Sequence, residues 1–253
     1  MSLHDSMIKS GHTLFRYRSY LPFLMIGPVL IALRESVYIE DLVGDDIEDL
    51  WVFGAFLMSL FGLFLRAITV GHVPAGTSGR NTQSQKASQL NTTGMYSIVR
   101  NPLYLGNFII ILGVLLSIKV WWLILLGCLG FFIYMERIIL AEEKFLTEEY
   151  GEKYLEWRAK TPIILPNLNL WQKPALPFSL RTVLKREYPA LIAIGTCFFI
   201  TELITDVFFE KEPFTKWFFD DIVWSIMMGT VLTIGLTLRF LKKKTNLLKV
   251  EGR

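Results

Sequence analysis

Cysteine and histidine are scarce in this chain, which has two cysteines and three histidines among its 253 residues. Cys128 and Cys197 lie inside long apolar stretches, so they support neither a disulfide framework nor a metal site. The histidines, at His4, His12 and His72, are too few to assemble a zinc site. We therefore expect no metal centre.

Two familiar signatures are also missing. The first 19 residues are polar and lack the apolar core of a cleavable signal peptide. No G-x-G-x-x-G sequence occurs between a strand and a helix, so a dinucleotide-binding Rossmann domain is not expected. The formal net charge of +3 does not indicate a nucleic-acid partner, because the basic residues gather where anionic lipid headgroups are expected.

Long apolar runs are abundant, and 52% of the residues are hydrophobic. Six of these runs can cross a hydrocarbon core of roughly 30 Å as helices, although the third is short. They cover Tyr20 to Tyr38, Leu50 to Val70, Pro102 to Ile118, Val120 to Leu140, Tyr188 to Phe209 and Asp221 to Leu241, with Pro189 opening the fifth. The sequence therefore predicts an all-α, multi-pass transmembrane helix bundle, in which the third and fourth spans form a tight hairpin.

The distribution of basic residues predicts the orientation, since cytoplasmic loops keep an excess of Lys and Arg. With the N-terminus inside, 21 of the 26 basic residues fall on the cytosolic side when Arg137 and Arg239, near the cytosolic ends of their spans, are counted with them. The first external loop, Glu40 to Asp49, then carries six acidic residues and no basic one. We expect both termini to be cytosolic, in a bacterial cytoplasmic membrane rather than the endoplasmic reticulum.

The chain divides into three expected parts: 1–49 with the first span, 50–166 as the core, and 167–253 with two extra spans. Gly71 to Arg100 is a long polar cytosolic segment, which is either a binding loop or a plain linker. Glu142 to Arg158 is predicted to be a charged helix that leaves the membrane. Thr161 to Pro177 contains four prolines and is predicted to be extended chain.

The densest motif surrounds the start of the third span. Asn101 and Pro102 suit a helix start, because Asn caps free amides and Pro fits the first helical position. That structural explanation does not account for the residues around them, namely Gly94, Tyr96, Arg100, Tyr104 and Gly106, although Gly106 could simply permit close helix packing. Some 40 residues later, Glu142 and Glu143 end the partner helix of the hairpin, where they are either ligands or part of a solvated face.

These residues carry a family resemblance. The series Arg100-Asn101-Pro102-x-Tyr104-x-Gly106, then Glu142-Glu143 and a tail with Tyr150-Gly151-x-x-Tyr154, resembles the isoprenylcysteine carboxyl methyltransferase and phospholipid methyltransferase superfamily over roughly Leu50 to Pro166. The resemblance implies S-adenosylmethionine at the cytosolic end of the third and fourth spans and a lipid or lipidated acceptor that enters from the bilayer. The cofactor site would be formed by the cytosolic loop and the helix that leaves the membrane.

Specific positions carry over from this resemblance. Asn101, Pro102, Tyr104 and Gly106 would shape the cofactor pocket, and Glu142 and Glu143 would contact its polar parts. Tyr96 and Tyr104 would offer aromatic faces to the adenine or the sulfonium. The carboxyl methyltransferases usually have histidine where this chain has Asn101, which leaves His72 as the only nearby histidine, either a base or an ordinary interfacial residue. The two extra spans would build an oligomer interface or a substrate groove.

The acceptor is the least specified part. Arg66 and Arg100, with Arg80 and Lys86 in the loop, favour an acceptor with a carboxylate or phosphate oxygen, because guanidinium groups bind such oxyanions well. Arg66 could instead be a snorkelling residue. Three alternatives remain: an amine-directed phospholipid methyltransferase, an NADPH-dependent sterol-type reductase, which Leu103 argues against, and a non-catalytic lipid-binding protein. The last would require charges that face one another deep in the bundle, and the sequence shows none outside Arg34-Glu35 and Glu202-Asp206.

Overall fold

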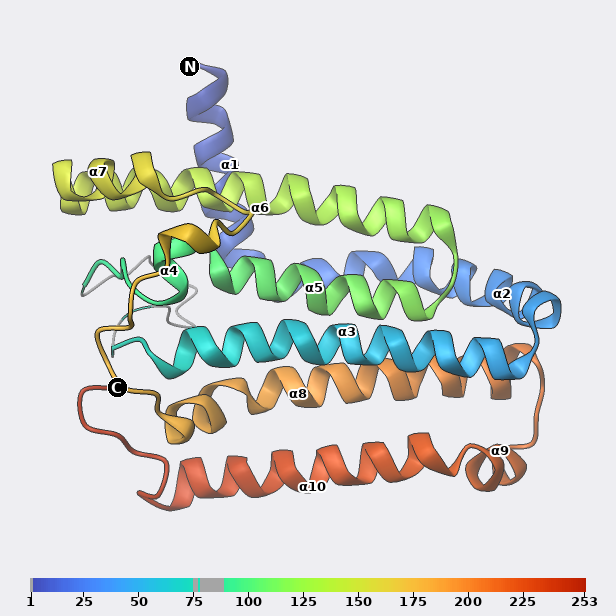
Figure 1. Cartoon of the computed structure of the whole chain (residues 1–253). Helices are drawn as coiled ribbons and strands as arrows, with labels where there is room; N and C mark the ends of the chain where they lie inside the picture. Colours follow the sequence, from blue (N-terminus) through green and yellow to red (C-terminus); the bar gives the residue numbers. More distant parts are fainter. Residues whose placement is uncertain (1, 75–76, 78–88) are drawn as a thin grey trace.

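The computed structural model describes residues 2–74, 77 and 89–253 and is a bundle of helices with no strand in these ranges (Figure 1). The longer helices run side by side, and α1 crosses them. Their bounds are α1 Leu3–Tyr17, α2 Ile26–Val43, α3 Asp45–Gly71, α4 Met95–Ile98, α5 Pro102–Ser117, α6 Trp121–Tyr150, α7 Glu152–Lys160, α8 Leu180–Leu203, α9 Phe214–Asp220 and α10 Ile222–Lys244. Short helical turns lie at Leu21–Met25, Leu168–Leu170 and Ile204–Phe209.

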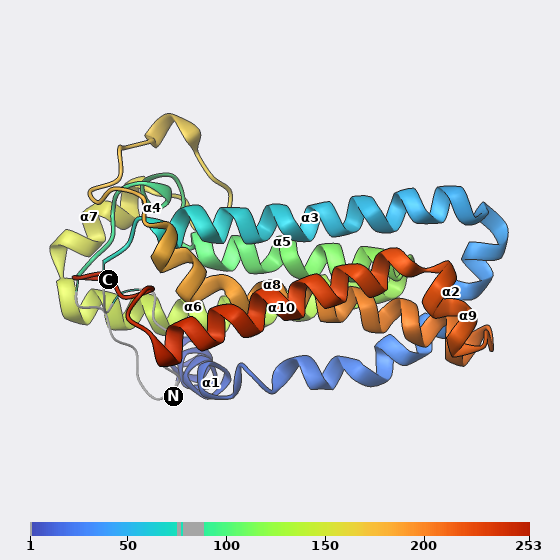
Figure 2. The ribbon, with the colours of Figure 1, turned by 90° about the horizontal axis from the view of Figure 1, so that it is seen from below.

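Five of the described helical segments are long and apolar enough to cross a membrane: those of α2, α3, α6, α8 and α10. The sixth expected span, α5, has 16 residues and is about 24 Å long at 1.5 Å per residue. The multi-pass all-α bundle is thus confirmed with five candidate spans, and a shorter apolar helix, α5, lies where the short third span was predicted. Both chain ends lie at the same end of the bundle as α4 and α7 (Figures 1 and 2).

Two boundary predictions are wrong. Pro189 does not open the fifth span, because α8 begins at Leu180, where the hydroxyl of Ser179 accepts a hydrogen bond from the Thr182 amide and caps the helix. The acidic stretch from Glu40 to Asp49 is not a loop either. α2 and α3 continue into it from both sides and meet at Gly44, whose φ of +83° is a conformation that glycine adopts readily.

The seam between α3 and α5 is lined by small residues. A Cβ atom at Gly62 would lie 2.7 Å from the carbonyl oxygen of Gly106, and one at Gly113 would lie 2.2 Å from Oγ of Ser59. The Ser59 hydroxyl donates to the carbonyl of Ile110 across the same seam (2.9 Å). Small residues let helix backbones approach closely within a membrane, so this seam holds the two helices in tight contact.

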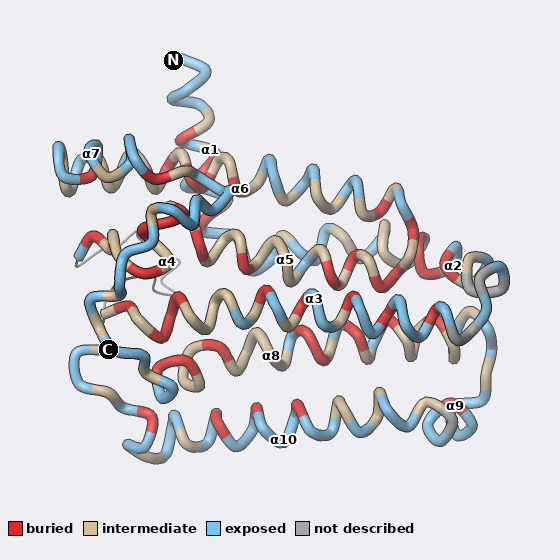
Figure 3. Tube along the Cα trace, in the orientation of Figure 1, coloured by how far each residue is buried: buried red, intermediate tan, exposed pale blue. Residues whose placement is uncertain are grey.

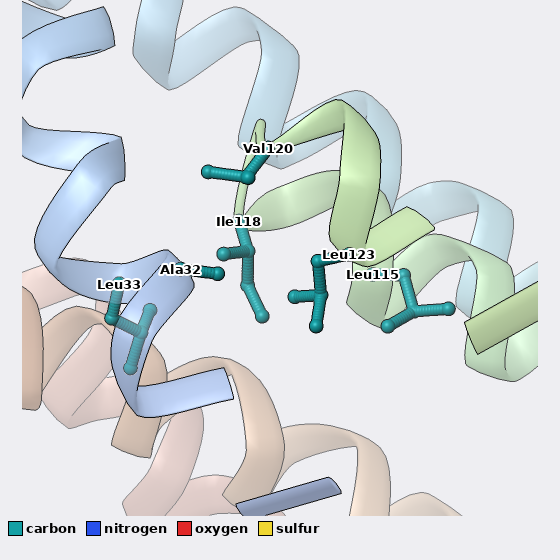
Figure 4. Close-up of a cluster of buried hydrophobic side chains, with 6 residues drawn as sticks. All are labelled: Ala32, Leu33, Leu115, Ile118, Val120 and Leu123. Atoms are coloured by element: carbon teal, nitrogen blue, oxygen red, sulfur yellow. The ribbon is translucent and has the colours of Figure 1, made fainter. Parts of the chain in front are cut away.

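The α5–α6 hairpin is as tight as predicted, with only Ile118, Lys119 and Val120 between the helices. Ile118 and Val120 are buried in the turn and join a cluster with α2 (Figure 4). The whole cluster consists of Ala32, Leu33, Leu115, Ile118, Val120 and Leu123. It fixes the end of the hairpin that lies away from α4 and α7, and so sets the register of α5 against α6.

The polar N-terminal stretch forms a helix that the sequence analysis did not anticipate. Ser2 and Asp5 make a capping box at the start of α1. The helix crosses α6 so closely that a Cβ atom at Gly11 would lie 2.0 Å from the carbonyl oxygen of Arg137. Ile8 and Phe15 are buried on its inner side, so α1 covers the part of α6 that precedes Glu142 (Figure 3).

Candidate functional site

The return segment, residues 161–177, is extended chain as predicted, apart from the turn at Leu168–Leu170. It is bonded by its backbone to the chain just before α5. The Gly94 amide donates to Gln172 (3.0 Å), the Asn167 amide donates to Ile98 (2.9 Å), and the Arg100 amide donates to Pro162 (2.8 Å). These bonds fix α4 and the start of α5, where the motif residues lie.

Pro102 occupies the first position of α5, as predicted, and Asn101 precedes it. The predicted capping bond of Asn101 is wrong. Its side chain makes no hydrogen bond to an α5 amide and donates instead to the carbonyl of Ile163 in the return segment (3.1 Å). Asn101 therefore joins the return segment to the helix start.

Tyr104 and Glu142 are brought together across the hairpin. The Tyr104 hydroxyl donates to a carboxylate oxygen of Glu142 at 2.6 Å. Arg18, just after α1, adds a positive charge that acts on both groups. The pair thus connects α5 and α6 in a shielded position next to α1.

Glu143 points to a different set of partners. One carboxylate oxygen accepts a hydrogen bond from Arg100, and the other lies 3.4 Å from a guanidinium nitrogen of Arg158 in α7. The Arg100 and Glu143 side chains are 10% and 13% exposed, so the pair is largely shielded from water. The buried Nε of Arg100 has no hydrogen-bond partner among the described residues. The two neighbouring glutamates are therefore parts of separate clusters.

Tyr154 closes the Arg100 cluster from α7. Its side chain is 1% exposed, and this burial raises the pKa of Tyr154 to about 12, with the Glu143 charge acting in the same direction. The neighbouring Trp157 donates its ring N–H to the carbonyl of Tyr96 (3.1 Å). Tyr96 thus anchors α7 through its backbone, while a role for its ring in cofactor binding stays a prediction.

Gly106 faces α3. A Cβ atom at this position would lie 2.6 Å from Cγ of Arg66 and 2.9 Å from the carbonyl oxygen of Gly62. The absence of a side chain therefore lets Arg66 pass over α5, and any contribution of Gly106 to a cofactor pocket stays a prediction.

Arg66 forms a buried ionic cluster that the sequence analysis missed. Its guanidinium makes two hydrogen bonds to the Glu187 carboxylate in α8, at 2.8 and 3.0 Å, and one to the Asn107 side chain in α5, at 2.6 Å. Arg66 and Glu187 are only 14% and 6% exposed. The expectation that no further charges face one another deep in the bundle is wrong, because residues 121 positions apart in the sequence meet here.

His72 binds to the far end of the return segment. Its Nδ1 lies 2.9 Å from the carbonyl oxygen of Leu176, and its ring contacts Phe178. None of these contacts connects His72 to the Arg100 or Tyr104 clusters. The contacts of His72 are therefore those of an ordinary interfacial residue, and its role as a base stays a prediction. Arg80 and Lys86, proposed from the sequence as acceptor ligands, lie outside the described residues.

A pocket of about 260 Å³ adjoins the Arg100 cluster. Its walls come from the start of α1, the end of α6 and α7, and they combine carboxylates with basic groups. The lining residues are His4, Leu140, Glu143, Lys144, Thr147, Glu148 and Arg158. The pocket has groups of both charge signs, as S-adenosylmethionine requires for its carboxylate, ammonium and sulfonium. These groups would exchange their present partners on binding, since Glu143 is paired with Arg100 and Arg158, and Lys144 with Glu148. The orphaned Nε of Arg100 lies in the adjoining cluster and adds an unused donor.

Comparisons with known proteins agree with the resemblance. Residues 50–153 match the family model described as phospholipid methyltransferase. The nickel-cobalt-cadmium resistance protein NccN of Alcaligenes xylosoxydans xylosoxydans is 29% identical over 63% of this chain and 69% of its own length. The cobalt-zinc-cadmium resistance protein CzcN of Cupriavidus metallidurans is 31% identical, over 48% and 54% of the two lengths.

A relative from a eukaryote is named for a chemical reaction, methyl transfer. The protein-S-isoprenylcysteine O-methyltransferase of Schizosaccharomyces pombe is 32% identical over 42% of this chain and 45% of its own length. The chain thus spans only about half the length of two of these three relatives. No solved structure matches the chain.

Proposed function

Because residues 50–153 match the phospholipid methyltransferase family model and the chain is similar to an isoprenylcysteine methyltransferase, we propose that this chain transfers a methyl group from S-adenosylmethionine to a membrane-embedded lipid or lipidated acceptor. The methyl goes onto a carboxylate or phosphate oxygen. The observation that carries the proposal is the Arg100–Glu143–Arg158 cluster and its adjoining pocket, which lie at the ends of two membrane helices.

The chain's own residues would hold the cofactor through charge. S-adenosylmethionine supplies a methyl group activated by a sulfonium. Glu143 and Glu148 line the pocket and would bind the positive groups, whereas Lys144 and Arg158 would bind the carboxylate. Tyr104 holds the Glu142 side chain in one orientation, at the position of α6 that immediately precedes Glu143.

Arg100 is the better of the two candidate acceptor ligands. An anionic acceptor needs orientation more than deprotonation, and Arg100 has one donor, Nε, that is not used by any described residue. Arg66 uses three donors on Glu187 and Asn107 and would have to exchange a partner to bind an acceptor. We therefore assign acceptor orientation to Arg100 and treat Arg66 as a residue that holds α3, α5 and α8 together.

The two relatives named for metal resistance do not change this proposal. Within residues 2–74, 77 and 89–253, no group of three or more His, Cys, Asp or Glu side chains is placed to hold a metal ion. The deep Arg66–Glu187 pair fits the alternative of a lipid-binding scaffold, but that alternative gives no role to the Arg100 cluster. An enzyme accounts for both clusters.

Purified protein in detergent tests the cofactor directly. Calorimetric titration with S-adenosylmethionine should give saturable binding, and titration with NADPH should give none. The reverse result would support the reductase and contradict the methyltransferase.

Incubation with membranes and methyl-labelled S-adenosylmethionine then identifies the acceptor class. A carboxyl methyl ester releases labelled methanol in mild alkali, whereas an N-methyl group does not. Label confined to alkali-stable amines would replace the oxygen acceptor with an amine.

The membrane orientation is part of the proposal. The cytosolic placement of both termini rests on the excess of basic residues on that side, and α4, α7 and the pocket share that end of the bundle. Single cysteines in a cysteine-free background test it. A cysteine near Thr93 should react with an impermeant maleimide only after the membrane is opened, and labelling of intact cells there would overturn the orientation.

A further inference from the structure

A second cavity, of about 270 Å³, lies between α3, α8 and α10, away from the Arg100 cluster. Its walls are almost entirely apolar and include Phe64, Ala67, Leu184, Leu191, Ile234 and Leu238. We refer to it as the C-terminal groove. Phe64 and Ile234 are 57% and 41% exposed, so the groove opens on the side of the bundle that faces lipid. Two of its three walls come from α8 and α10, which lie outside the family match.

The mouth of the groove is basic. Lys242 lies one helical turn beyond Leu238 on α10, and its ammonium is 5.4 Å from the ring centroid of Tyr188, which also lines the groove. The last turn of α10 carries Lys243 and Lys244 as well. The C-terminal groove thus ends, at the headgroup level, beside the Lys242 ammonium, whereas Lys244, two residues further on, lies on another side of α10.

We propose that the C-terminal groove binds one acyl chain of an anionic phospholipid from the adjacent leaflet, whose phosphate-bearing headgroup is held at Lys242. The apolar walls suit a hydrocarbon chain, and basic residues next to a membrane helix attract anionic headgroups. Glu187 borders the groove, but its charge is balanced by Arg66 and does not repel the lipid. This site is independent of the methyltransferase proposal.

A second copy of the chain suits the groove less well. A symmetric pair in a membrane places the same residues of both copies at the same depth, so Lys242 to Lys244 of one copy would face those of the other. Like charges brought together in this way repel one another. An anionic lipid would instead place a negative headgroup beside these lysines, so no like charges would meet. Lipid is therefore the favoured occupant.

The test uses the full chain in nanodiscs, without S-adenosylmethionine, and a trace of phosphatidylglycerol that carries a diazirine on one acyl chain. After illumination, mass spectrometry maps the cross-linked peptides. We expect the cross-links to concentrate on the groove segments of α3, α8 and α10. Phosphatidylcholine with the same labelled chain should give about one fifth of that labelling, as expected from the attraction of one basic residue for an anionic lipid.

Two pairs of variants sharpen the result. Lys242→Gln should lower groove labelling by phosphatidylglycerol about fivefold, whereas Lys244→Gln, with the same charge change two residues away, should not. Leu191→Trp should fill the groove and remove labelling by both lipids. Leu236→Trp, on a position of α10 that is 62% exposed, is the matched control and should leave labelling unchanged.

Several outcomes would overturn the site. Equal labelling by the two lipids would overturn the anionic headgroup, and cross-links spread evenly over α2 and α10 would overturn a defined groove. Cross-links between two copies through α10, with the groove protected from lipid, would make a second copy the occupant.

Discussion

Two arginines in this chain, Arg66 and Arg100, have nearly the same partner chemistry and quite different surroundings. Arg66 is bound by Glu187 and Asn107 from two other membrane helices, and its hydrogen bonds are made within the bundle. Arg100 shares Glu143 with Arg158, keeps one buried donor unused, and lies beside a pocket. The difference shows that a buried ion pair alone does not mark a site: the Arg66 pair only joins helices, whereas the Glu143 and Arg158 partners of the Arg100 cluster line a pocket.

The deep pair should give the largest effect when it is broken. Arg66→Leu leaves the Glu187 carboxylate buried without its counter-charge, and we expect a loss of about 3–5 kcal/mol in the free energy of unfolding. Glu187→Leu should act similarly. The double variant Arg66→Leu/Glu187→Leu should recover much of the loss, because no unpaired charge remains. Unfolding in mixed micelles measures the stability of all three variants. A single variant as stable as the wild type would show that the Arg66–Glu187 pair does not hold the helices together.

The Arg100 cluster should show an effect on binding in addition to one on folding, because Glu143→Ala also leaves the largely buried Arg100 without its carboxylate partner. Glu143→Ala should weaken S-adenosylmethionine binding about tenfold, since it removes a charge-assisted contact worth about 1.5 kcal/mol. Glu149→Ala removes an exposed carboxylate from the same helix and serves as the control. Calorimetry in detergent measures both affinities. Equal affinities would remove Glu143 from the cofactor site.

The Tyr104–Glu142 bond should contribute less. Tyr104→Phe keeps the ring and removes the hydroxyl, which should cost about 1 kcal/mol of stability because the carboxylate loses a donor. Tyr134→Phe is the control, since it removes a nearby hydroxyl and leaves the Tyr104 bond intact. Thermal unfolding in detergent distinguishes them, and equal midpoints would show that the hydrogen bond does not stabilise the fold.

The smallest effect concerns alkaline pH. The folded state holds the pKa of Tyr154 at about 12, above its usual value of 10. The stability that comes from keeping this phenol neutral is therefore complete below about pH 10 and is lost as the pH rises towards 12. Unfolding midpoints measured from pH 8 to 11.5 should fall less steeply for Tyr154→Phe than for the wild type. Parallel curves would contradict the role of burial at Tyr154.

The sequence predicted the membrane bundle and the short third span because apolar run length decides both. The tight hairpin predicted only that the start of α5 and the end of α6 lie close together, and the contact between Tyr104 and Glu142 was seen first in the structure. Glu187 could not be found in this way, because its partner lies 121 residues earlier and pairing between distant helices leaves no local pattern. The helix at Leu3–Tyr17 was missed for a related reason. It is polar overall, and its few apolar residues can be recognised as buried only when the α6 surface that they cover is known.

The return segment has a consequence for moving the motif region into another protein. The family match ends at residue 153, yet the backbone of the motif region is paired with Pro162, Asn167 and Gln172. The segment that matches the family model is therefore shorter than the segment whose backbone bonds hold the motif region in place. A chimera that carried only residues 50–153 into another membrane scaffold would bring the motif residues without the return segment that holds them in place. A segment that keeps its structure in another protein would have to extend through Leu176, whose carbonyl oxygen is hydrogen-bonded to His72.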